Sequence, residues 1–188
     1  MKGASKVKPR VIETVSRLFY EQGFHATGIN QIIENSSVAK ASLYQHFSSK
    51  DDLLDAYLQH ISEQWHKDFE AFSANQTTGE NKILALFDFR RQLAVKNQFK
   101  GCAFIRVAYE LPDLNVQARE KIQNHKNYIK NFIKENIMRL SNPPPQQQVD
   151  ELLELLLYLY EGCGIQSTVL RSAQPIEEAK KIAQKLLR

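Results

Sequence analysis

Residues 27–50 have the sequence TGINQIIENSSVAKASLYQHFSSK, which predicts two short helices joined by a tight turn. Thr27 is a residue type that caps helix N-termini, and the isoleucines that follow recur at helical spacing on one face. The Asn-Ser-Ser sequence at 35–37 interrupts this pattern with side chains that favour turns. Apolar residues then return at helical spacing between 38 and 47, so a second helix is expected there.

The second helix is short, and its outer face carries hydrogen-bonding side chains. When its apolar residues face inward, Lys40, Ser42, Gln45 and His46 face solvent. A helix with so little to bury is suited to being presented to a partner. Its donors and acceptors are of the types that read base edges and bind phosphates in nucleic acid.

The distribution of charge agrees with a nucleic-acid partner. The net charge of the chain is +4. Residues 1–50 contain seven Lys and Arg against three Asp and Glu, whereas residues 51–188 contain eighteen of each. The whole excess therefore lies where attraction to phosphate requires it, although a chance fluctuation in a short segment remains an alternative. A basic leader, either an arm on the DNA backbone or a solvated terminus, comprises Lys2, Lys6, Lys8 and Arg10.

The same stretch resembles the helix-turn-helix of the tetracycline-repressor (TetR) family of bacterial transcriptional regulators. The string SLYQHFSSKDDLL at residues 42–54 is the most specific part of the resemblance. Beyond the first third of the chain, the resemblance extends only to size and helical character. The matching residues are Phe19, Gly23, Phe24, Thr27, Ile32, Val38, Lys40, Ser42, Leu43, Tyr44, His46, Phe47, Lys50, Leu53 and Leu54.

The fold class predicted for the whole chain is all-α, with about nine helices, because no segment alternates as a strand does. A three-helix DNA-binding domain is expected over 1–50, and a helical effector-binding and dimerisation domain over 51–188. Ser48-Ser49 is expected to cap a long helix that runs to about residue 74. The later helices are expected at 83–95, 102–111, 113–139, 149–170 and 176–187, with SNPPPQQQ at 141–148 as a linker.

The resemblance implies which residues contact a palindromic operator in double-stranded DNA. Carried over by position, the phosphate contacts are Thr27, Tyr44 and Lys50. The residues that face the groove are Lys40, Ala41, Ser42, Gln45 and His46, among which Lys40 suits guanine and Gln45 suits adenine. Packing roles for Tyr44 and His46 remain open as alternatives.

Two positions depart from the family pattern. Ser37 stands in the turn where the family often has glycine, so the turn must strain or adapt. Ala39 stands where an N-capping serine is common, and the loss of a cap typically costs about 1 kcal/mol. Ser36 or Ser37 is the expected substitute cap.

The helix at 149–170 has leucines on nearly every side. Because each leucine left in water forfeits about 1.5–3 kcal/mol of burial, a second face is expected to meet another chain. The resemblance implies a homodimer formed by the last two helices. A buried central helix of a monomer is the alternative. The expected interface residues are Leu152, Leu156, Leu159, Cys163 and Ile182.

The resemblance also implies a small-molecule effector site within residues 55–170. Its expected lining favours an apolar or aromatic ligand, although each member can equally be ordinary core. The candidate polar contacts for that ligand are Arg91, Arg106 and Glu110. The expected lining consists of Trp65, Phe69, Phe87, Phe104, Tyr109 and Tyr158.

The function expected is therefore that of a repressor that leaves its operator when ligand binds. One alternative is a protein-interaction module that uses the lysine-rich helix 119–134. Another is a redox or electrophile sensor based on Cys102, for which a small buried side chain is the plainer interpretation. No catalytic motif, metal-ligand spacing or cofactor motif is recognised in the sequence, so neither an enzyme nor a metal or cofactor site is expected. A cytoplasmic bacterial protein without membrane attachment, on the nucleoid when bound to DNA, is expected.

Overall fold

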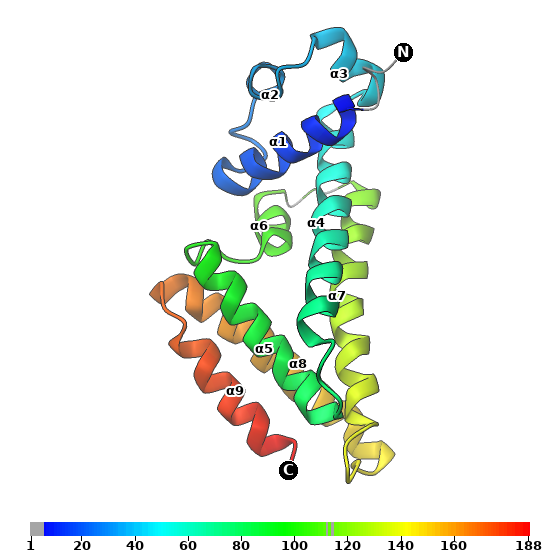
Figure 1. Cartoon of the computed structure of the whole chain (residues 1–188), viewed down its shortest axis with the longest axis vertical. Coiled ribbons are helices and arrows are strands. Elements are labelled where there is room, and N and C mark those ends of the chain that lie inside the picture. Colours follow the sequence, from blue (N-terminus) through cyan, green and yellow to red (C-terminus); the bar gives the residue numbers. More distant parts are fainter. Residues whose placement is uncertain (1–5, 112, 114) are drawn as a thin grey trace. The chain divides into compact units, whose positions relative to one another are not determined.

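The computed structural model describes residues 6–111, 113 and 115–188, which form helices and no strand (Figure 1). The all-α prediction is thereby confirmed, while Lys2 of the basic leader lies outside the described residues. No helix in the described ranges is long and apolar enough to cross a membrane. The helices are α1 Val7–Gln22, α2 Ile29–Ser36, α3 Lys40–His46, α4 Lys50–Ser73, α5 Gly79–Lys96, α6 Ala103–Glu110, α7 Val116–Ile137, α8 Gln146–Leu170 and α9 Gln174–Leu186.

These helices form two compact units that do not follow chain order. The first unit contains the chain up to Trp65 together with Ala103–Asn124, and the second contains His66–Cys102 together with His125–Arg188. Helices α4 and α7 therefore contribute to both units, and α6 belongs with α1–α3. The boundary predicted after residue 50, between a DNA-binding domain and an effector-binding domain, stays a prediction.

The first unit is built on the apolar face of α1. Val11, Val15, Leu18 and Phe19 are buried along that helix at helical spacing. The ring of Phe19 lies 5.6 Å from that of Tyr57 on α4, nearly perpendicular to it. Helices α2 and α3, with the residues next to α3, add further apolar side chains to this core, which are Ile32, Val38, Leu43 and Phe47.

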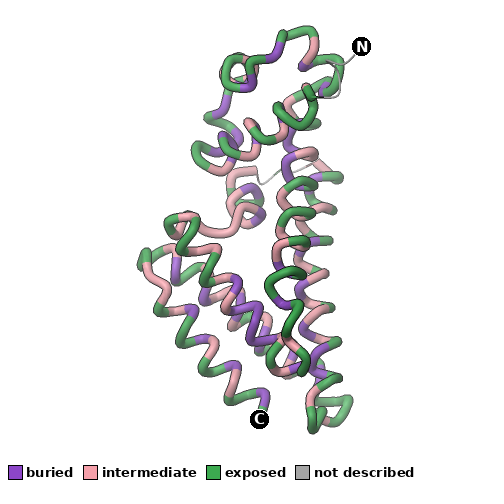
Figure 2. The backbone as a smooth tube through the Cα atoms, in the orientation of Figure 1, coloured by how far each residue is buried: buried purple, intermediate pink, exposed green. Residues whose placement is uncertain are grey.

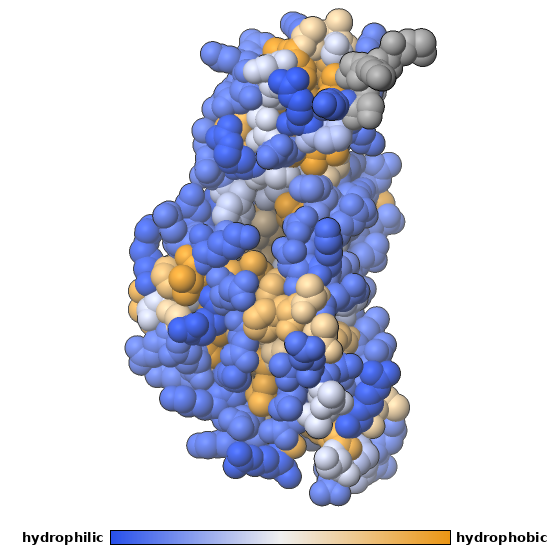
Figure 3. All heavy atoms as spheres, viewed as in Figure 1, coloured by the Kyte–Doolittle hydropathy of each residue, from blue (hydrophilic) through white to orange (hydrophobic). Residues whose placement is uncertain are grey.

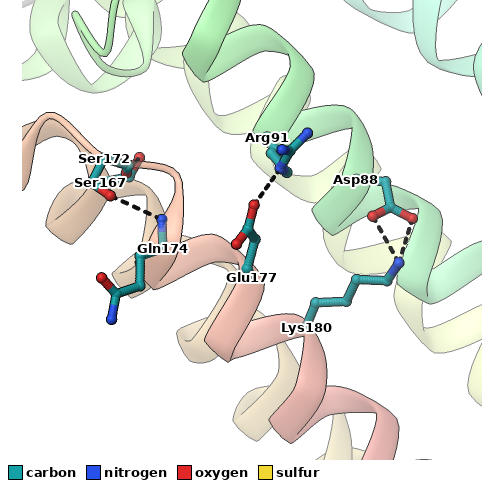
Figure 4. Close-up of polar contacts among 7 residues, drawn as sticks. All are labelled: Asp88, Arg91, Ser167, Ser172, Gln174, Glu177 and Lys180. Atoms are coloured by element: carbon teal, nitrogen blue, oxygen red, sulfur yellow. Dashed lines mark hydrogen bonds and ion pairs between the residues drawn. The ribbon is translucent and has the colours of Figure 1, made fainter.

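The second unit has its most deeply buried segment on α5, where Ile83–Phe87 and Phe89 are buried (Figure 2). Helix α9 lies against α5 and is held to it by two ion pairs. Arg91 Nε lies 2.6 Å from Glu177, and Lys180 Nζ lies 2.7 Å from Asp88 (Figure 4). At the corner between α8 and α9, the Ser167 hydroxyl donates to the Ser172 carbonyl at 2.6 Å.

A ladder of ion pairs joins α7 to α8 within the second unit. Lysines one helical turn apart on α7 each meet an acidic residue of α8, which runs in the opposite direction. The pairs are Lys126–Glu161 at 2.8 Å, Lys130–Glu154 at 2.5 Å and Lys134–Asp150 at 2.9 Å. Since exposed pairs contribute little each, the ladder sets the alignment of the helices more than their stability.

Helices α5, α7 and α8 begin three or four residues away from their predicted starts. Helix α5 begins at Gly79, because the Thr78 hydroxyl accepts from the Asn81 N–H at 3.2 Å and caps it. Helix α7 begins at Val116, since Asn115 Oδ1 accepts from the Ala118 N–H at 2.7 Å. Helix α8 extends back to Gln146, following Pro145.

His125 gives the second unit a specific dependence on pH. Burial, then the neighbouring charges of Lys126, His66 and Arg90, lower the pKa of His125 from 6.5 to about 3. In the unfolded chain its pKa is ordinary, so between those two values protons bind the unfolded state preferentially. The free energy of unfolding therefore falls as pH drops below about 6.5, and the effect vanishes above that pH.

We predict that His125→Gln removes about 2 kcal/mol of the stability loss that the wild type shows between about pH 7 and about pH 5. Denaturant unfolding at the two pH values measures it. His60→Gln, at an exposed histidine, is the matched control and is expected to keep the wild-type pH dependence. Identical pH dependence in His125→Gln and wild type would contradict the prediction.

Candidate DNA-binding surface

The turn between α2 and α3 accommodates a serine in a left-handed conformation. Ser37 has φ of 51°, and its N–H donates to the Glu34 carbonyl at 3.2 Å. The Val38 N–H then donates to the Ile33 carbonyl at 3.4 Å. A non-glycine residue in this region costs about 1 kcal/mol. The turn therefore adapts to Ser37 as the sequence predicted.

The hydroxyl caps predicted for α2 and α3 are not formed. The Thr27 hydroxyl donates to the Gly23 carbonyl at 2.7 Å, and the Ser36 hydroxyl donates to the Ile32 carbonyl at 2.6 Å. The residues at the two N-cap positions are Gly28 and Ala39, neither of which has a side-chain cap. The prediction failed because each hydroxyl finds a carbonyl four residues earlier. Since Thr27 is fully buried, its predicted phosphate contact is not available in this conformation.

Arg10 of α1 stabilises the end of α2. Its guanidinium donates to the Ser36 carbonyl at 2.8 Å and to the Ser37 carbonyl at 3.3 Å. Carbonyls in the last turn of a helix lack helical partners, so these bonds satisfy groups that would otherwise need water. Arg10 therefore belongs to the scaffold of the turn and has neither of the two roles predicted for the basic leader.

Helix α3 divides cleanly into an inner and an outer face. Leu43 is buried within the helix, and Phe47 is buried just after it. Tyr44 is 44% exposed and His46 is exposed, so the packing roles considered for them are excluded. In the described part of the chain, the polar outer side chains make no hydrogen bond or ion pair with the protein. The groove-facing residues predicted from sequence all lie on this one helix, half-buried at Ser42 and exposed at Lys40, Ala41, Gln45 and His46.

Lys50 lies at the start of α4, beside the end of α3. Its Nζ lies 4.2 Å above the centroid of the Phe24 ring. Burial lowers the pKa of Lys50, while Glu110 and Asp51 raise it. The predicted cap of α4 is confirmed, because the Ser49 hydroxyl accepts from the Asp52 N–H at 3.0 Å. Lys50 is thus held on an aromatic ring at the edge of the α3 surface.

The aromatic residues predicted to line an effector site are divided between the two units. Phe69 and Phe87 are buried in the second unit, where the Phe69 ring lies 5.0 Å from Phe132 and 5.5 Å from Phe89. Trp65 and Phe104 belong to the first unit. The prediction is wrong for Tyr109 and Tyr158, because these side chains are 81% and 67% exposed.

The polar residues proposed for the effector have other partners. Arg91 pairs with Glu177, while Arg106 and Glu110 bond to backbone groups of the first unit. The inward arginine that the sequence analysis missed is Arg90, whose guanidinium carbon lies 3.6 Å from the centroid of the Tyr160 ring. Its inward position could have been predicted from helical spacing, because residue 90 lies on the same face of α5 as the buried residues 83, 86 and 87.

Arg90 is part of a buried charged cluster in the second unit. Its Nη2 lies 3.6 Å from Glu161, which also pairs with Lys126 at 2.8 Å. Burial opposes the charged form of Arg90, but Tyr160 and Glu161 raise its pKa overall. A side chain at Gly164 would collide with the Arg90 guanidinium, so it would force Arg90 out of its present position. The interior of this unit thus combines aromatic side chains with the charged cluster of Arg90 and Glu161.

The two cysteines differ in their surroundings. Cys163 is buried, its thiol donates to the Tyr160 carbonyl at 3.1 Å, and burial raises its pKa to about 11. A thiol with so high a pKa is unreactive at neutral pH. Cys102 is half-buried and lies just before α6. Cys102 is therefore less buried than the plainer interpretation, a small buried side chain, predicted.

The interface residues predicted on α8 and α9 fall on different faces. Leu156 and Cys163 are buried in the core of their own subunit, so their assignment to an interface is wrong. Leu152 and Leu159 are half-buried, and Ile182 is 49% exposed. Hydrophobic side chains do reach the surface in patches (Figure 3). On these two helices the exposed apolar residues are Leu155, Tyr158, Ile165, Val169, Leu170, Ile182 and Leu186, which we call the outer apolar face.

The chain is similar in sequence to known bacterial regulators. Residues 11–57 match the family model described as bacterial regulatory proteins, tetR family. The HTH-type transcriptional repressor NemR of Escherichia coli K12 is 21% identical over 182 residues, covering 92% of this chain and 89% of NemR. The HTH-type transcriptional regulator YxaF of Bacillus subtilis is 47% identical over 47 residues, covering 24% of this chain and 25% of YxaF.

Solved structures show the same fold. A TetR transcriptional regulator from Chloroflexus aurantiacus has a TM-score of 0.85 at 24% identity, covering 98% of this chain and 96% of that chain. SCO4454, a TetR-family regulator from Streptomyces coelicolor, has a TM-score of 0.82 at 24% identity, covering 98% of this chain and 95% of that chain. The relatives described here are transcriptional regulators rather than enzymes.

Proposed function

We propose that this chain, which is a DNA-binding transcriptional regulator of the TetR family, acts as a homodimeric repressor of a palindromic operator. A small apolar or aromatic ligand bound in the C-terminal part of the chain releases it from DNA. The single observation that carries the proposal is the outer face of α3, where four polar side chains have no partner in the described protein.

In the proposed complex, α3 enters the major groove with these side chains towards the base edges. Lys40 donates to guanine and Gln45 pairs with adenine, while Ala41 and Ser42 permit close approach to the bases. Tyr44 and Lys50 contact phosphates at either side, and Lys50 is held for this role by the Phe24 ring. Thr27 is left out of this interface because it is buried.

A second copy of the chain is proposed to cover the outer apolar face. Its α8 members Leu155, Tyr158, Ile165 and Val169 follow helical spacing, so they form one stripe along the helix. Two-fold pairing of α8 and α9 with their copies buries this stripe in a four-helix interface. A dimer then presents two α3 helices to half-sites one turn of DNA apart.

Ligand control is proposed to act through two conformations of the dimer that differ in DNA affinity. A ligand lowers that affinity only by its differential binding to the two conformations. The aromatic interior around Phe69 and Phe87 supports an apolar or aromatic ligand. The ion-paired Arg90 offers such a ligand one charged contact, if the ligand replaces Glu161.

Two alternative functions differ in their support. A protein-interaction role for the lysines of α7 is disfavoured, because Lys126, Lys130 and Lys134 already pair with α8. A sensing role for Cys102 is favoured by its partial exposure.

We predict that Lys50→Ala weakens binding to all DNA sequences alike and lowers the salt slope of the affinity by about one, because one phosphate contact is lost. Lys40→Ala and Gln45→Ala are expected to change the preferred base instead, at about 1–3 kcal/mol per contact. Fluorescence anisotropy with a selected operator and its point variants, at several salt concentrations, measures both effects. Unchanged affinity and salt slope in Lys50→Ala would contradict the proposed docking.

We predict that Ile165→Asp produces monomers at concentrations where the wild type is a dimer, because two carboxylates would be buried at the two-fold interface. Sedimentation equilibrium measures this. Val95→Asp, at an exposed apolar residue of α5, is the matched control and is expected to stay dimeric. A wild-type protein that remains monomeric at high concentration would refute the dimer itself.

We predict that 2-naphthol, as an apolar aromatic probe, lowers operator affinity, whereas mannitol does not. Calorimetry establishes whether the probe binds, and anisotropy measures the affinity. Bound probe with unchanged operator affinity would count against ligand control. In a parallel arm, iodoacetamide that releases DNA from the wild type but not from Cys102→Ser would favour the sensing alternative.

A further inference from the structure

The turn that follows α1 is held by two side chains of α6. The Glu110 carboxylate accepts from the Phe24 N–H at 3.0 Å and from the His25 N–H at 2.6 Å. The Arg106 guanidinium donates to the Tyr20 carbonyl, and its central carbon lies 5.2 Å from the centroid of the Tyr20 ring. We call this pair of residues, Arg106 and Glu110, the α6 clamp.

The clamp binds backbone groups that α1 leaves without helical partners. Helix α1 ends at Gln22, so the N–H groups of Phe24 and His25 lie beyond its hydrogen-bond ladder. The Tyr20 carbonyl lies in the last turn of α1, where the helix provides no further N–H to donate to it. Bonds from such groups to a charged side chain are about twice as strong as bonds between neutral groups.

Gly23 has a backbone conformation that suits this contact. Its φ of +97° is a conformation that side chains rarely adopt, and a Cβ there would lie 2.9 Å from both Glu110 carboxylate oxygens. Glycine is therefore favoured by the backbone conformation, and any side chain there would also displace the carboxylate from its present position. Glu110 thus contacts a residue 87 positions earlier in the chain, and this contact is part of the structure of the turn.

The same turn supports a residue of the proposed DNA interface. Phe24 donates its N–H to Glu110 and carries Lys50 Nζ over its ring at 4.2 Å. The turn also leads directly into α2, and α2 leads into α3. A displacement of Glu110 therefore reaches both the phosphate-contacting lysine and the two helices presented to DNA.

We infer that the α6 clamp is a positioning element for DNA binding: Arg106 and Glu110 hold α1–α3 in the arrangement that binds DNA. This rests on the proposed function, since it assigns residues outside the helix-turn-helix to the same activity. The apparent dissociation constant rises in inverse proportion to the fraction of molecules in the binding arrangement. Loss of the clamp lowers that fraction without removing any contact to DNA.

The test compares DNA affinity, salt slope and amide hydrogen exchange in clamp variants of the full chain. Glu110→Ala is expected to weaken binding about tenfold, the change that corresponds to loss of a charge-assisted hydrogen bond. Its salt slope is expected to stay at the wild-type value, because every phosphate contact remains. Exchange at the Phe24 and His25 amides is expected to accelerate. Arg106→Met is expected to weaken binding in the same way.

Two further variants make the result decisive. Glu110→Gln keeps one acceptor oxygen and nearly the same shape, so its affinity is expected to lie between wild type and Glu110→Ala. Glu120→Ala, at an exposed carboxylate of the same unit, is the matched control and is expected to bind as wild type. If Glu110→Ala does not fold, the Glu110→Gln comparison carries the test.

The outcomes separate the two proposals. A wild-type chain that binds no DNA sequence would refute the proposed function. A wild-type chain that binds, with Glu110→Ala and Glu110→Gln binding equally well or more tightly, would refute the clamp alone. A lower salt slope in Glu110→Ala would also refute it, since the carboxylate would then act on a phosphate contact and not on the arrangement of the helices.

Discussion

Burial of Leu43 and Phe47 holds the helix on which the proposed activity depends. Helix α3 has seven residues, and an isolated helix of that length is unstable in water because nucleation outweighs the few hydrogen bonds gained. Its stability must come from packing, at about 1.5–3 kcal/mol for each large apolar side chain buried. The inner side chains therefore pack into the core built on α1, and the outer ones remain available to bind DNA.

The second unit shows the same division on a longer helix. On α8, Leu153, Leu156 and Tyr160 enter the core, and the ladder of ion pairs to α7 occupies an adjoining edge. What remains is the outer apolar face. An apolar stripe left exposed on a helix that is otherwise fully engaged is typical of an interface between chains.

Charged side chains complete two helix ends in the first unit. Arg10 binds the carbonyls at the end of α2, and Arg106 and Glu110 bind the end of α1 and its following turn. Each comes from another helix, because the backbone groups at a helix end point along the axis and not towards neighbours on the same helix. The geometry of the α3 surface thus depends on charged residues that contact no DNA in the proposed complex.

The helical fold, the position of α3 and the identity of its outer residues could all be predicted from the amino-acid sequence. These follow from local spacing, since helical periodicity alone decides which side chains of a short helix share a face. The sequence also predicted that Ser37 would have to adapt and that Ser49 would cap α4. Helical phase would have identified Arg90 as well, because it lies on the buried stripe of α5.

Which of those residues have other partners became known from the packing of the helices. Thr27 was predicted as a cap and a phosphate contact, and burial turned its hydroxyl back to Gly23. Leu156 was predicted at an interface and lies in the core, while Glu110 was sought in a ligand site and holds the turn after α1. The reason is physical: a helical pattern shows that a side chain shares a face with others. What that face meets depends on elements that can lie far along the chain, as the contact of Glu110 with Phe24 across 86 residues illustrates.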